Sequence, residues 1–186
     1  MAKNLRVFMT GASGGMGMES LKQMMPNVGK AYDLVLLVRN SEKNRKEMAP
    51  FKGKDGLEIV WGDLDDKEAL KRCLSDTDLV IHIAAFVSPS ADYYPKRAMQ
   101  VNYGGTKNLI ECIYELGEEK SCAFVYIGTV AETGDRMPPI HWGRVGDPIK
   151  PSIFDYYAVS KVAAERLVIE SGLTRWASLR QTGIMG

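Results

Sequence analysis

Short apolar runs alternate with helical patterns along the whole chain, and this alternation restricts the fold more than any other feature. Six runs are typical of β-strands, at residues 5–9, 34–38, 57–61, 79–84, 122–127 and 176–180. Helical patterns lie over residues 16–25, 41–48, 65–74, 96–116 and 156–170. Strands that alternate with helices build a parallel sheet. We therefore predict a doubly wound α/β fold, with a parallel sheet flanked by helices on both faces.

The composition is that of an ordinary globular domain. Twenty-four Lys and Arg residues are balanced by 23 Asp and Glu, and the net charge of +1 argues against a nucleic-acid-binding protein. Hydrophobic residues make up 45% of the chain, too many for a disordered segment. No apolar run reaches the roughly 18 residues of a transmembrane helix, and the start lacks the apolar stretch of a secretory signal. The sequence thus predicts no membrane or nucleic-acid partner.

The cysteines and histidines show no metal-binding pattern. Cys73, Cys112 and Cys122 are odd in number and lack CxxC spacing, while His82 and His141 are far apart. We predict no metal site and no disulfide, and we expect a reduced, cytoplasmic protein.

A glycine-rich loop directly follows the first strand. Its sequence, Thr10-Gly-Ala-Ser-Gly-Gly-Met-Gly17, places glycines at 11, 14 and 17. In such a turn one glycine makes the bend, another lets the backbone approach a pyrophosphate, and a third lets helix and strand pack closely. The helix N-terminus then offers free N–H groups to the phosphates. Glycine-rich turns without ligands are frequent, but this position in a βαβ unit predicts a dinucleotide-binding Rossmann fold.

The residue after the second strand indicates which dinucleotide binds. NAD-binding proteins usually have an acidic residue there, which holds the ribose 2′-hydroxyl. This chain has Arg39 at that place. A guanidinium favours a 2′-phosphate through charge-assisted hydrogen bonds, although a solvated arginine at a strand end is also common. We expect NADP, with NAD as the alternative.

A tyrosine and a lysine in the last predicted helix are candidates for acid–base chemistry. Tyr157 and Lys161 are four residues apart, on one face of the helix. The pKa of a free tyrosine is about 10, and a nearby ammonium would lower it toward neutral pH. Such pairs are often only surface pairs. The neighbouring Tyr156 has Ser160 at the equivalent spacing and no cation.

At this point the chain resembles a known family. Its motifs are similar, in order along almost the whole sequence, to those of the extended short-chain dehydrogenase/reductase family. The similar segments are the glycine-rich loop, Gly62-Asp63-Leu64, His82-Ile-Ala-Ala85, Val101-Asn102-Tyr-Gly-Gly105-Thr106 with Asn108-Leu109, and Tyr157 to Lys161 followed by Glu165.

The resemblance implies a role for each matching residue. Tyr157 would be the acid or base, Lys161 would tune it and hold the nicotinamide ribose, and Thr129 would orient the substrate oxygen. The implied cofactor-binding residues are Gly11, Ser13, Gly14, Met16, Gly17, Arg39, Asp63, Leu64, Ala84, Ala85, Asn102, Tyr157 and Lys161. Three of these roles have structural alternatives, because Thr129 could end a strand, Asn102 could pack a helix and Asp63 could cap one. We expect His82 to be a core residue.

The segment after the fifth strand departs from the family pattern. The family usually has two adjacent serines there, followed by Val-Tyr-Gly. This chain has Gly128-Thr129 and then Val-Ala-Glu-Thr-Gly134. Thr129 keeps a hydroxyl at the substrate-binding position, while the changed flank weakens the similarity to typical sugar-nucleotide epimerases.

Three functions fit these motifs. The first is an NADP- or NAD-linked reductase or dehydrogenase, similar to the dihydroflavonol-reductase and 3β-hydroxysteroid-dehydrogenase groups, acting on a small-molecule carbonyl or hydroxyl. The second is an NAD-dependent nucleotide-sugar epimerase or dehydratase. The third is a non-catalytic dinucleotide sensor, which would have no need for the Thr129, Tyr157 and Lys161 set.

The remaining expectations concern the parts around the site. The long segment 129–155, including Met137 to Trp142, would line the substrate pocket, form a lid or pack on itself. Helices 96–116 and 156–170 would form a homodimer interface, as the resemblance implies. We expect residues 1–186 to be one NAD(P)-binding domain without the C-terminal substrate-binding region of its relatives, and the last strand to leave apolar surface uncovered.

Overall fold

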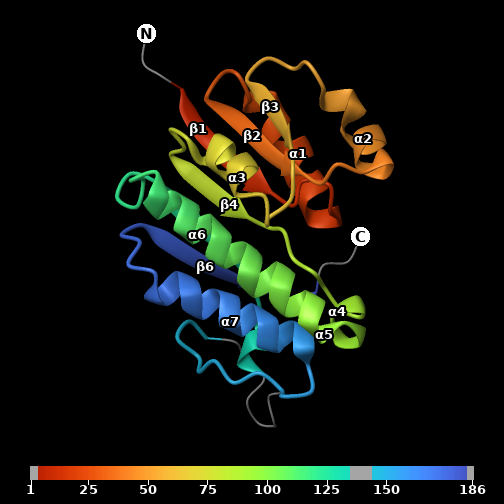
Figure 1. Cartoon of the computed structure of the whole chain (residues 1–186), viewed down its shortest axis with the longest axis vertical. Coiled ribbons are helices and arrows are strands. Elements are labelled where there is room, and N and C mark those ends of the chain that lie inside the picture. The colour runs from red at the N-terminus through yellow and green to blue at the C-terminus, as the bar shows by residue number, and fades with distance from the viewer. Residues whose placement is uncertain (1–3, 135–143, 184–186) are drawn as a thin grey trace.

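The structure, a computed structural model, describes residues 4–134 and 144–183, and these residues form a six-stranded sheet (Figure 1). Its strands are β1 (Leu5–Thr10), β2 (Tyr32–Val38), β3 (Leu57–Trp61), β4 (Leu79–His82), β5 (Ala123–Thr129) and β6 (Trp176–Gln181). All neighbouring strands are parallel, in the order β3-β2-β1-β4-β5-β6. The predicted doubly wound sheet is confirmed. The direction of winding reverses between β1 and β4, and ligands of such folds bind at that reversal, outside the carboxyl ends of the strands.

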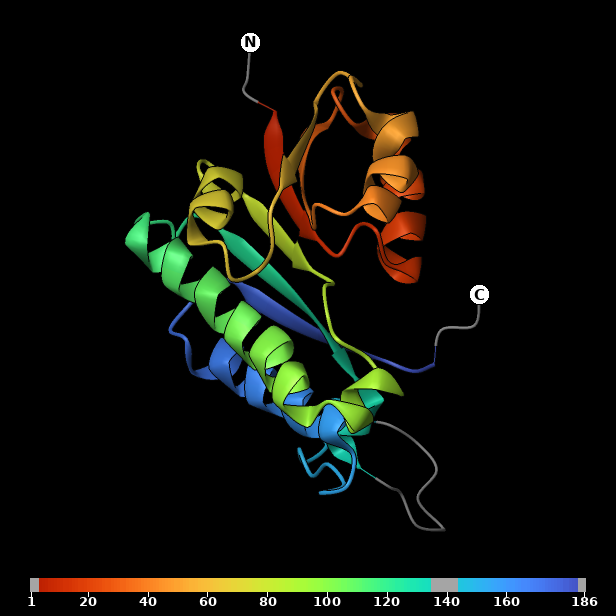
Figure 2. The same ribbon diagram turned by 45° about the vertical axis from the view of Figure 1, so that its right-hand side comes forward.

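Helices cover both faces of this sheet (Figure 2). On one face lie α1 (Gly15–Met24) and α2 (Glu42–Met48), and on the other lie α3 (Lys67–Leu74), α6 (Gly105–Glu115) and α7 (Tyr156–Glu170). Shorter helical segments are α4 (Ser90–Tyr93), α5 (Pro95–Ala98), η1 (Met25–Asn27), η2 (Ala49–Phe51), η3 (Met99–Gly104) and η4 (Val130–Thr133). None of the described helices combines the length and the apolar character that crossing a lipid bilayer requires.

Each face of the sheet has its own apolar core, because successive side chains of a strand point to opposite faces. Phe8 and Val35 belong to the core under α3, α6 and α7, whereas Val7, Met9 and Leu34 belong to the core under α1 and α2. Burial on both faces explains why the central strands are apolar throughout. The two cores fix the carboxyl ends of β1, β2 and β4 next to one another.

The predicted helix at 96–116 is wrong in detail. The structure divides it into α5, the π-helical turn η3 and α6. The turn widens at Asn102, whose amide is bound to Phe86 and Ser160. A π-turn in a longer helix is frequently found at functional sites.

The last strand leaves apolar side chains in contact with solvent, as the sequence predicts. Trp176 is 42% exposed and Leu179 is 55% exposed. The face of β6 that carries Leu179 also carries Ala177, which is exposed as well.

Candidate cofactor and active site

Two close backbone approaches shape the glycine-rich loop. Gly11 has a φ of +79°, and a Cβ there would lie 2.6 Å from the backbone nitrogen of Ala84, just after β4. A Cβ at Gly17 would overlap the carbonyl oxygen of Gly11. Only glycine fits at both positions, so α1 can begin directly against the end of β1.

The N-terminus of α1 is uncapped. Its N-cap residue, Gly14, has no side chain to bond the first N–H groups, and the first turn holds no acidic residue. These N–H groups have no acceptor within the helix and carry a partial positive charge. The loop therefore offers donors that suit a phosphate.

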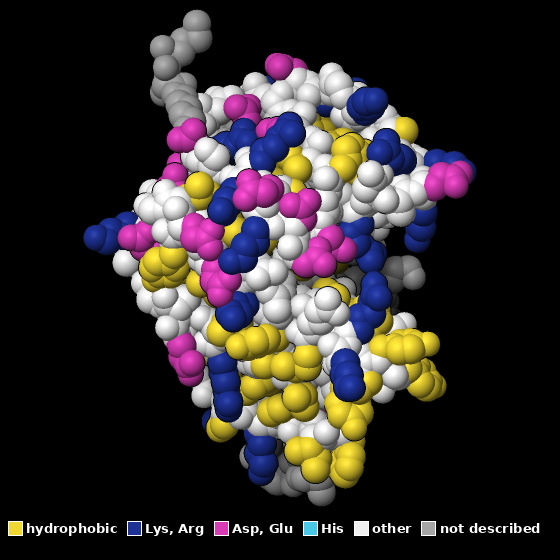
Figure 3. All heavy atoms as spheres, viewed as in Figure 1, with side chains coloured by type: hydrophobic (Ala, Val, Ile, Leu, Met, Phe, Trp, Pro, Cys, Tyr) yellow, Lys and Arg dark blue, Asp and Glu magenta, His cyan; other side chains and the backbone are white. Residues whose placement is uncertain are grey.

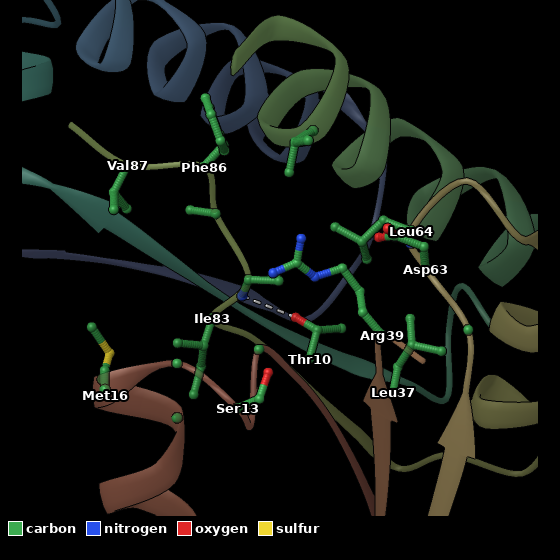
Figure 4. A pocket seen from close by; sticks show the side chains of 18 of the residues that line it. Thr10, Ser13, Met16, Leu37, Arg39, Asp63, Leu64, Ile83, Phe86 and Val87 are labelled. Carbon is green, nitrogen blue, oxygen red and sulfur yellow. Dashed lines mark hydrogen bonds between the residues drawn. The ribbon is translucent and has the colours of Figure 1, made fainter. Parts of the chain in front are cut away.

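A cavity of about 370 Å³ opens beside this loop, at the carboxyl ends of the first four strands (Figure 4). Ten of the thirteen residues predicted to bind a cofactor line it, namely Gly11, Ser13, Gly14, Met16, Gly17, Arg39, Asp63, Leu64, Ala84 and Ala85. The cavity thus lies where the winding of the sheet reverses, and its volume is typical of a small-molecule site.

Arg39 and Asp63 come into the cavity from the ends of β2 and β3. Figure 4 shows the Arg39 guanidinium extending into the cavity. The Asp63 carboxylate accepts the backbone N–H of Leu64 at 2.8 Å, which fixes the turn after β3. Asn108 on α6 donates to the Leu64 carbonyl at 2.9 Å, and a Cβ at Gly105 would lie 2.6 Å from Leu64. Asn108 and Gly105 of α6 therefore fix the position of Leu64 in the cavity wall.

Nine residues of the cavity wall were not among those predicted to bind the cofactor, and three of them lie outside every motif and strand that the sequence indicated. Phe86 and Val87 follow β4, and Arg97 lies on α5. The Arg97 guanidinium lies 5.6 Å from the centre of the Phe86 ring, which places a second cation at the cavity. The segment after β4 has no periodic pattern, so nothing in the sequence marked these residues.

His82 is a buried core residue, as predicted. Its Nδ1 lies 2.7 Å from the Thr10 hydroxyl, and its Nε2 lies 3.0 Å from the Thr106 hydroxyl. The Thr106 hydroxyl donates to the Asn102 carbonyl, so Nε2 must donate to Thr106. Burial lowers the pKa of His82 to about 3, which keeps the ring neutral. This chain of hydrogen bonds ties the ends of β1 and β4 to the helical segment that starts at α5.

The structure does not bring Asn102 to the cavity. Its Oδ1 accepts the N–H of Phe86 at 2.7 Å, and its Nδ2 donates to the Phe86 carbonyl and to the Ser160 hydroxyl at 3.0 and 2.8 Å. Both amide hydrogens are used within the protein. The side chain has the packing role that was the alternative for it, and it positions Phe86, which does line the cavity.

Tyr157 and Thr129 meet where α7 begins. Asp155 caps this helix by accepting the N–H of Ala158 at 2.8 Å, which places Tyr157 in the first turn. The Tyr157 phenol lies close to the side chain of Thr129, the last residue of β5. Burial raises the pKa of Tyr157, and the neighbouring Thr129 side chain opposes that rise. The phenol is consequently protonated at neutral pH.

Lys161 does not lower the pKa of Tyr157, and that prediction is wrong. The Lys161 Nζ donates to the Ile127 carbonyl at 2.8 Å and lies 4.1 Å from the centre of the Tyr126 ring. The side chain is turned toward β5, and the larger effect on Tyr157 is its own burial. Burial also lowers the pKa of Lys161, to about 8, against the opposing charges of Glu132 and Glu165.

A group of buried charges continues from Lys161. Glu165, one turn further along α7, accepts from Arg180 of β6, whose Nε lies 3.1 Å from both carboxylate oxygens. Arg180 Nε also lies 3.2 Å from Glu132 Oε2. Glu165 belongs to the family motif, but neither Glu132 nor Arg180 was identified from the sequence.

The structure leaves one part of the prediction without a position. Met137 to Trp142, expected to line the pocket or form a lid, lie outside the described residues. Thr129, Tyr157 and Lys161 do not line the cavity. Lys161 directly follows Ser160, whose hydroxyl accepts from Asn102, and Asn102 in turn positions Phe86 of the cavity wall.

These features define a class of protein. A doubly wound parallel sheet with an uncapped helix, a glycine cradle and a cavity at the winding reversal forms a dinucleotide-binding Rossmann domain. Residues 7–181 match the model of the NAD dependent epimerase/dehydratase family, and the chain belongs to this family. The resemblance to the extended short-chain dehydrogenases/reductases is confirmed.

Relatives of several activities are similar to this chain. A UDP-N-acetylglucosamine 4,6-dehydratase (inverting) of Campylobacter jejuni is 31% identical over 124 residues, 66% of this chain and 36% of the relative. An NAD-dependent glucose-6-phosphate dehydrogenase of Haloferax volcanii is 29% identical over 170 residues, 87% of this chain and 60% of the relative. The crystal structure of the Thermus thermophilus UDP-glucose 4-epimerase in complex with NAD has 25% identity and a TM-score of 0.76, and the match covers 95% of this chain and 54% of that one. The matched part of the chain thus covers between about one third and two thirds of the length of each of these relatives.

Proposed function

We propose that this chain holds a nicotinamide dinucleotide in its cavity, as part of an enzyme that transfers a hydride between the nicotinamide and a small-molecule carbonyl or hydroxyl. The observation that carries the proposal is the proximity of Thr129 to a protonated Tyr157, on the fold whose cavity the predicted cofactor residues line. The bound nicotinamide would supply or accept the hydride. Family membership and the relatives of known activity support an NAD(P)-dependent enzyme.

The residues present suit each part of the dinucleotide. The uncapped N–H groups of α1 would hold the pyrophosphate, and Gly11 and Gly17 leave room for it. Asp63 would contact the adenosine end, and Lys161 would hold the nicotinamide ribose. Arg39 would bind the 2′-phosphate of NADP, which favours NADP over NAD.

An Arg39→Asp variant tests the cofactor assignment. The aspartate would repel the 2′-phosphate and would accept a ribose hydroxyl. We expect NADPH to bind about 10- to 100-fold more weakly, because a charge-assisted hydrogen bond contributes about 1.5–3 kcal/mol. NADH should bind equally well or better. Titration of nicotinamide fluorescence measures both.

The matched control is Arg166→Asp, the same change of charge on the exposed surface of α7. It should leave the ratio of NADPH to NADH affinity unchanged. An unchanged ratio in Arg39→Asp would remove Arg39 from the cofactor site.

In the reaction itself, the side chains of β5 and α7 would handle the proton. Tyr157 would donate its phenolic proton to the carbonyl oxygen as the hydride arrives, and it would accept a proton in the reverse direction. Thr129 Oγ1 accepts the N–H of Ala131 at 3.3 Å, which leaves its own hydrogen for the substrate oxygen or the phenol. The test is consumption of NADPH by the protein with a panel of aldehydes and ketones. Dinucleotide binding without turnover of any substrate would favour the sensor over the enzyme.

A nucleotide-sugar epimerase or dehydratase is the second candidate. It is favoured by the similarity to the Campylobacter dehydratase and the Thermus epimerase. Such an enzyme regenerates its cofactor in each cycle, and we expect it to keep the nucleotide through purification. Mass spectrometry of the denatured protein separates the two candidates, because retained NAD supports the epimerase or dehydratase and an empty site supports the reductase.

The exposed surface supports a homodimer as the partner of this chain. Figure 3 shows hydrophobic side chains gathered where α4 and α5 meet the beginning of α7. Tyr93, Tyr94, Phe154 and Tyr156 are exposed there. We propose that α6 and α7 form the interface, and sedimentation equilibrium of the purified protein should give twice the mass of one chain. Cys73, Cys112 and Cys122 are free thiols, which supports the expected cytoplasmic location.

A further inference from the structure

A fully buried carboxyl group adjoins the proposed catalytic residues. Glu132 lies on η4, and its side chain has no exposed surface. Its Oε1 accepts the N–H of Thr129 at 3.3 Å, and Thr129 Oγ1 in turn accepts the N–H of Ala131. The two residues form a capping box. Glu132 therefore fixes the backbone of the residue whose hydroxyl contacts Tyr157.

Gly128 provides the space that this carboxyl group occupies. A Cβ at position 128 would lie 3.2 Å from each carboxyl oxygen of Glu132 and 3.2 Å from Cγ of Arg180. Contacts of 3.2 Å are tight, so Glu132 or Arg180 would have to move by a few tenths of an ångström to accept a side chain at position 128.

The second carboxyl oxygen of Glu132 has the surroundings of a protonated atom. Oε2 is buried and accepts no hydrogen bond from the described residues. Arg180 lies close to it but donates to Glu165 instead. A buried ionised oxygen without a hydrogen-bond donor is costly, so a carboxyl group in such surroundings is favoured in its neutral form, with a proton. The unpartnered Oε2 is the atom that would carry it.

The charges around Glu132 agree with this assignment. Burial raises the pKa of Glu132 to about 9, the neighbouring carboxylate of Glu165 adds to the rise, and the charges of Lys161 and Arg180 oppose it. The groups that face it are Lys161, Glu165 and Tyr157 from α7, Arg180 from β6 and Tyr126 from β5. Lys161 and Arg180 both gain from a charge on Glu132, because a carboxylate there raises the pKa of the ammonium and of the guanidinium.

We propose that Glu132 is a positioning residue of the active site, a buried acid that Gly128 accommodates, that holds Thr129 toward Tyr157 and that carries a proton next to Lys161 at neutral pH. This proposal deepens the proposed function and rests on it for the role of the three catalytic residues. The protonation of Glu132 can be tested without turnover.

The first experiment compares urea unfolding of the wild type and Glu132→Gln between about pH 5.5 and 7.5. Glutamine imitates a protonated Glu132, since its amide oxygen can accept from Thr129 and its NH₂ group can donate to Glu165. The pKa of Glu132 is raised from 4.5 unfolded to about 9 folded, so between these values only the folded state holds the proton, and the stability that the proton contributes falls as pH rises. Relative to the variant, the unfolding constant of the wild type should rise about tenfold per pH unit, or about 100-fold in all. The control Glu170→Gln, on the exposed end of α7, should show no such trend.

The second experiment measures the pH profile of NADPH-dependent turnover for Glu132→Gln and Glu132→Val. Glutamine keeps the acceptor for Thr129, so turnover at pH 7 should stay within about threefold of the wild type. Valine removes the acceptor, and kcat should fall about tenfold or more at every pH while the KM for NADPH changes little. Gly128→Ser alone should lower the free energy of unfolding. In combination with Glu132→Val, the same change should no longer lower it.

The outcomes separate this proposal from the proposed function. A pH-independent ratio of unfolding constants would show that Glu132 is ionised and would overturn the proposal, whether or not the protein turns over a substrate. Absence of turnover in the wild type would contradict the proposed function alone. In that case amide exchange at Thr129 tests the positioning role. Rapid exchange in the valine variant, with protection retained in the glutamine variant, would support it, and equal exchange in both would contradict it.

Discussion

A Gly17→Ala variant should lose a large part of the stability of the domain. The added methyl group would overlap the carbonyl oxygen of Gly11 and lie 2.7 Å from its carbonyl carbon and 2.9 Å from Cα of Ala12. These neighbours are backbone atoms and cannot rotate away, so α1 must move off the end of β1. Overpacking costs about 1–3 kcal/mol and more when the backbone shifts, and we expect about 3 kcal/mol or more from urea unfolding.

The same variant should bind NADPH at least about 100-fold more weakly. Moving α1 displaces its uncapped N–H groups from the cavity, and each lost hydrogen bond to a charged group is worth about 1.5–3 kcal/mol. Binding is measured on the fraction that remains folded at low temperature.

The control is Gly15→Ala, two residues earlier on the same helix. A Cβ at Gly15 meets nothing within 4 Å, so stability should be unchanged or slightly higher. Equal stability of the two alanine variants would contradict the close helix–strand contact that the loop requires.

Local signals in the sequence were sufficient for much of the fold. The limits predicted for α7 match the structure, because Asp155 caps its start and an apolar periodicity runs to Glu170. The helical pattern over 41–48 is confirmed by α2, which Ser41 caps by accepting the N–H of Asn44. The break at η3 could not be predicted in the same way, since it depends on hydrogen bonds from Asn102 to Phe86 and Ser160, which are distant in sequence.

Those site residues that come just after the end of a strand were predictable from the sequence. The glycine loop, Arg39, Asp63 and Ala84 each follow a strand directly, and parallel strands end at one edge of the sheet. Burial was not predictable. It decides the direction of the pKa shifts of Tyr157 and Lys161, and the sequence suggested the wrong effect of the lysine on the tyrosine.

Replacing Tyr157 with phenylalanine should reduce kcat for carbonyl reduction by about 10²–10⁴-fold, the usual contribution of a positioned acid. The change removes only the phenolic hydroxyl, so the half-buried ring keeps its packing on α7. The affinity for NADPH should change by less than about threefold, because the residues that line the cavity are untouched. Stopped-flow and steady-state measurements of NADPH consumption give kcat and KM separately.

Tyr156→Phe is the matched control, since Tyr156 occupies the adjacent position in the same helical turn and is 43% exposed. It should retain wild-type turnover. The pH dependence adds a second criterion. Because burial raises the pKa of Tyr157, the phenol keeps its proton throughout the neutral range, and the acid step of reduction should not weaken between pH 6 and 8 through loss of that proton. Turnover by Tyr157→Phe equal to that of Tyr156→Phe would mean that the proton comes from another group. Thr129 would then be the next residue to replace, because its hydroxyl is the one that meets the phenol at the end of β5.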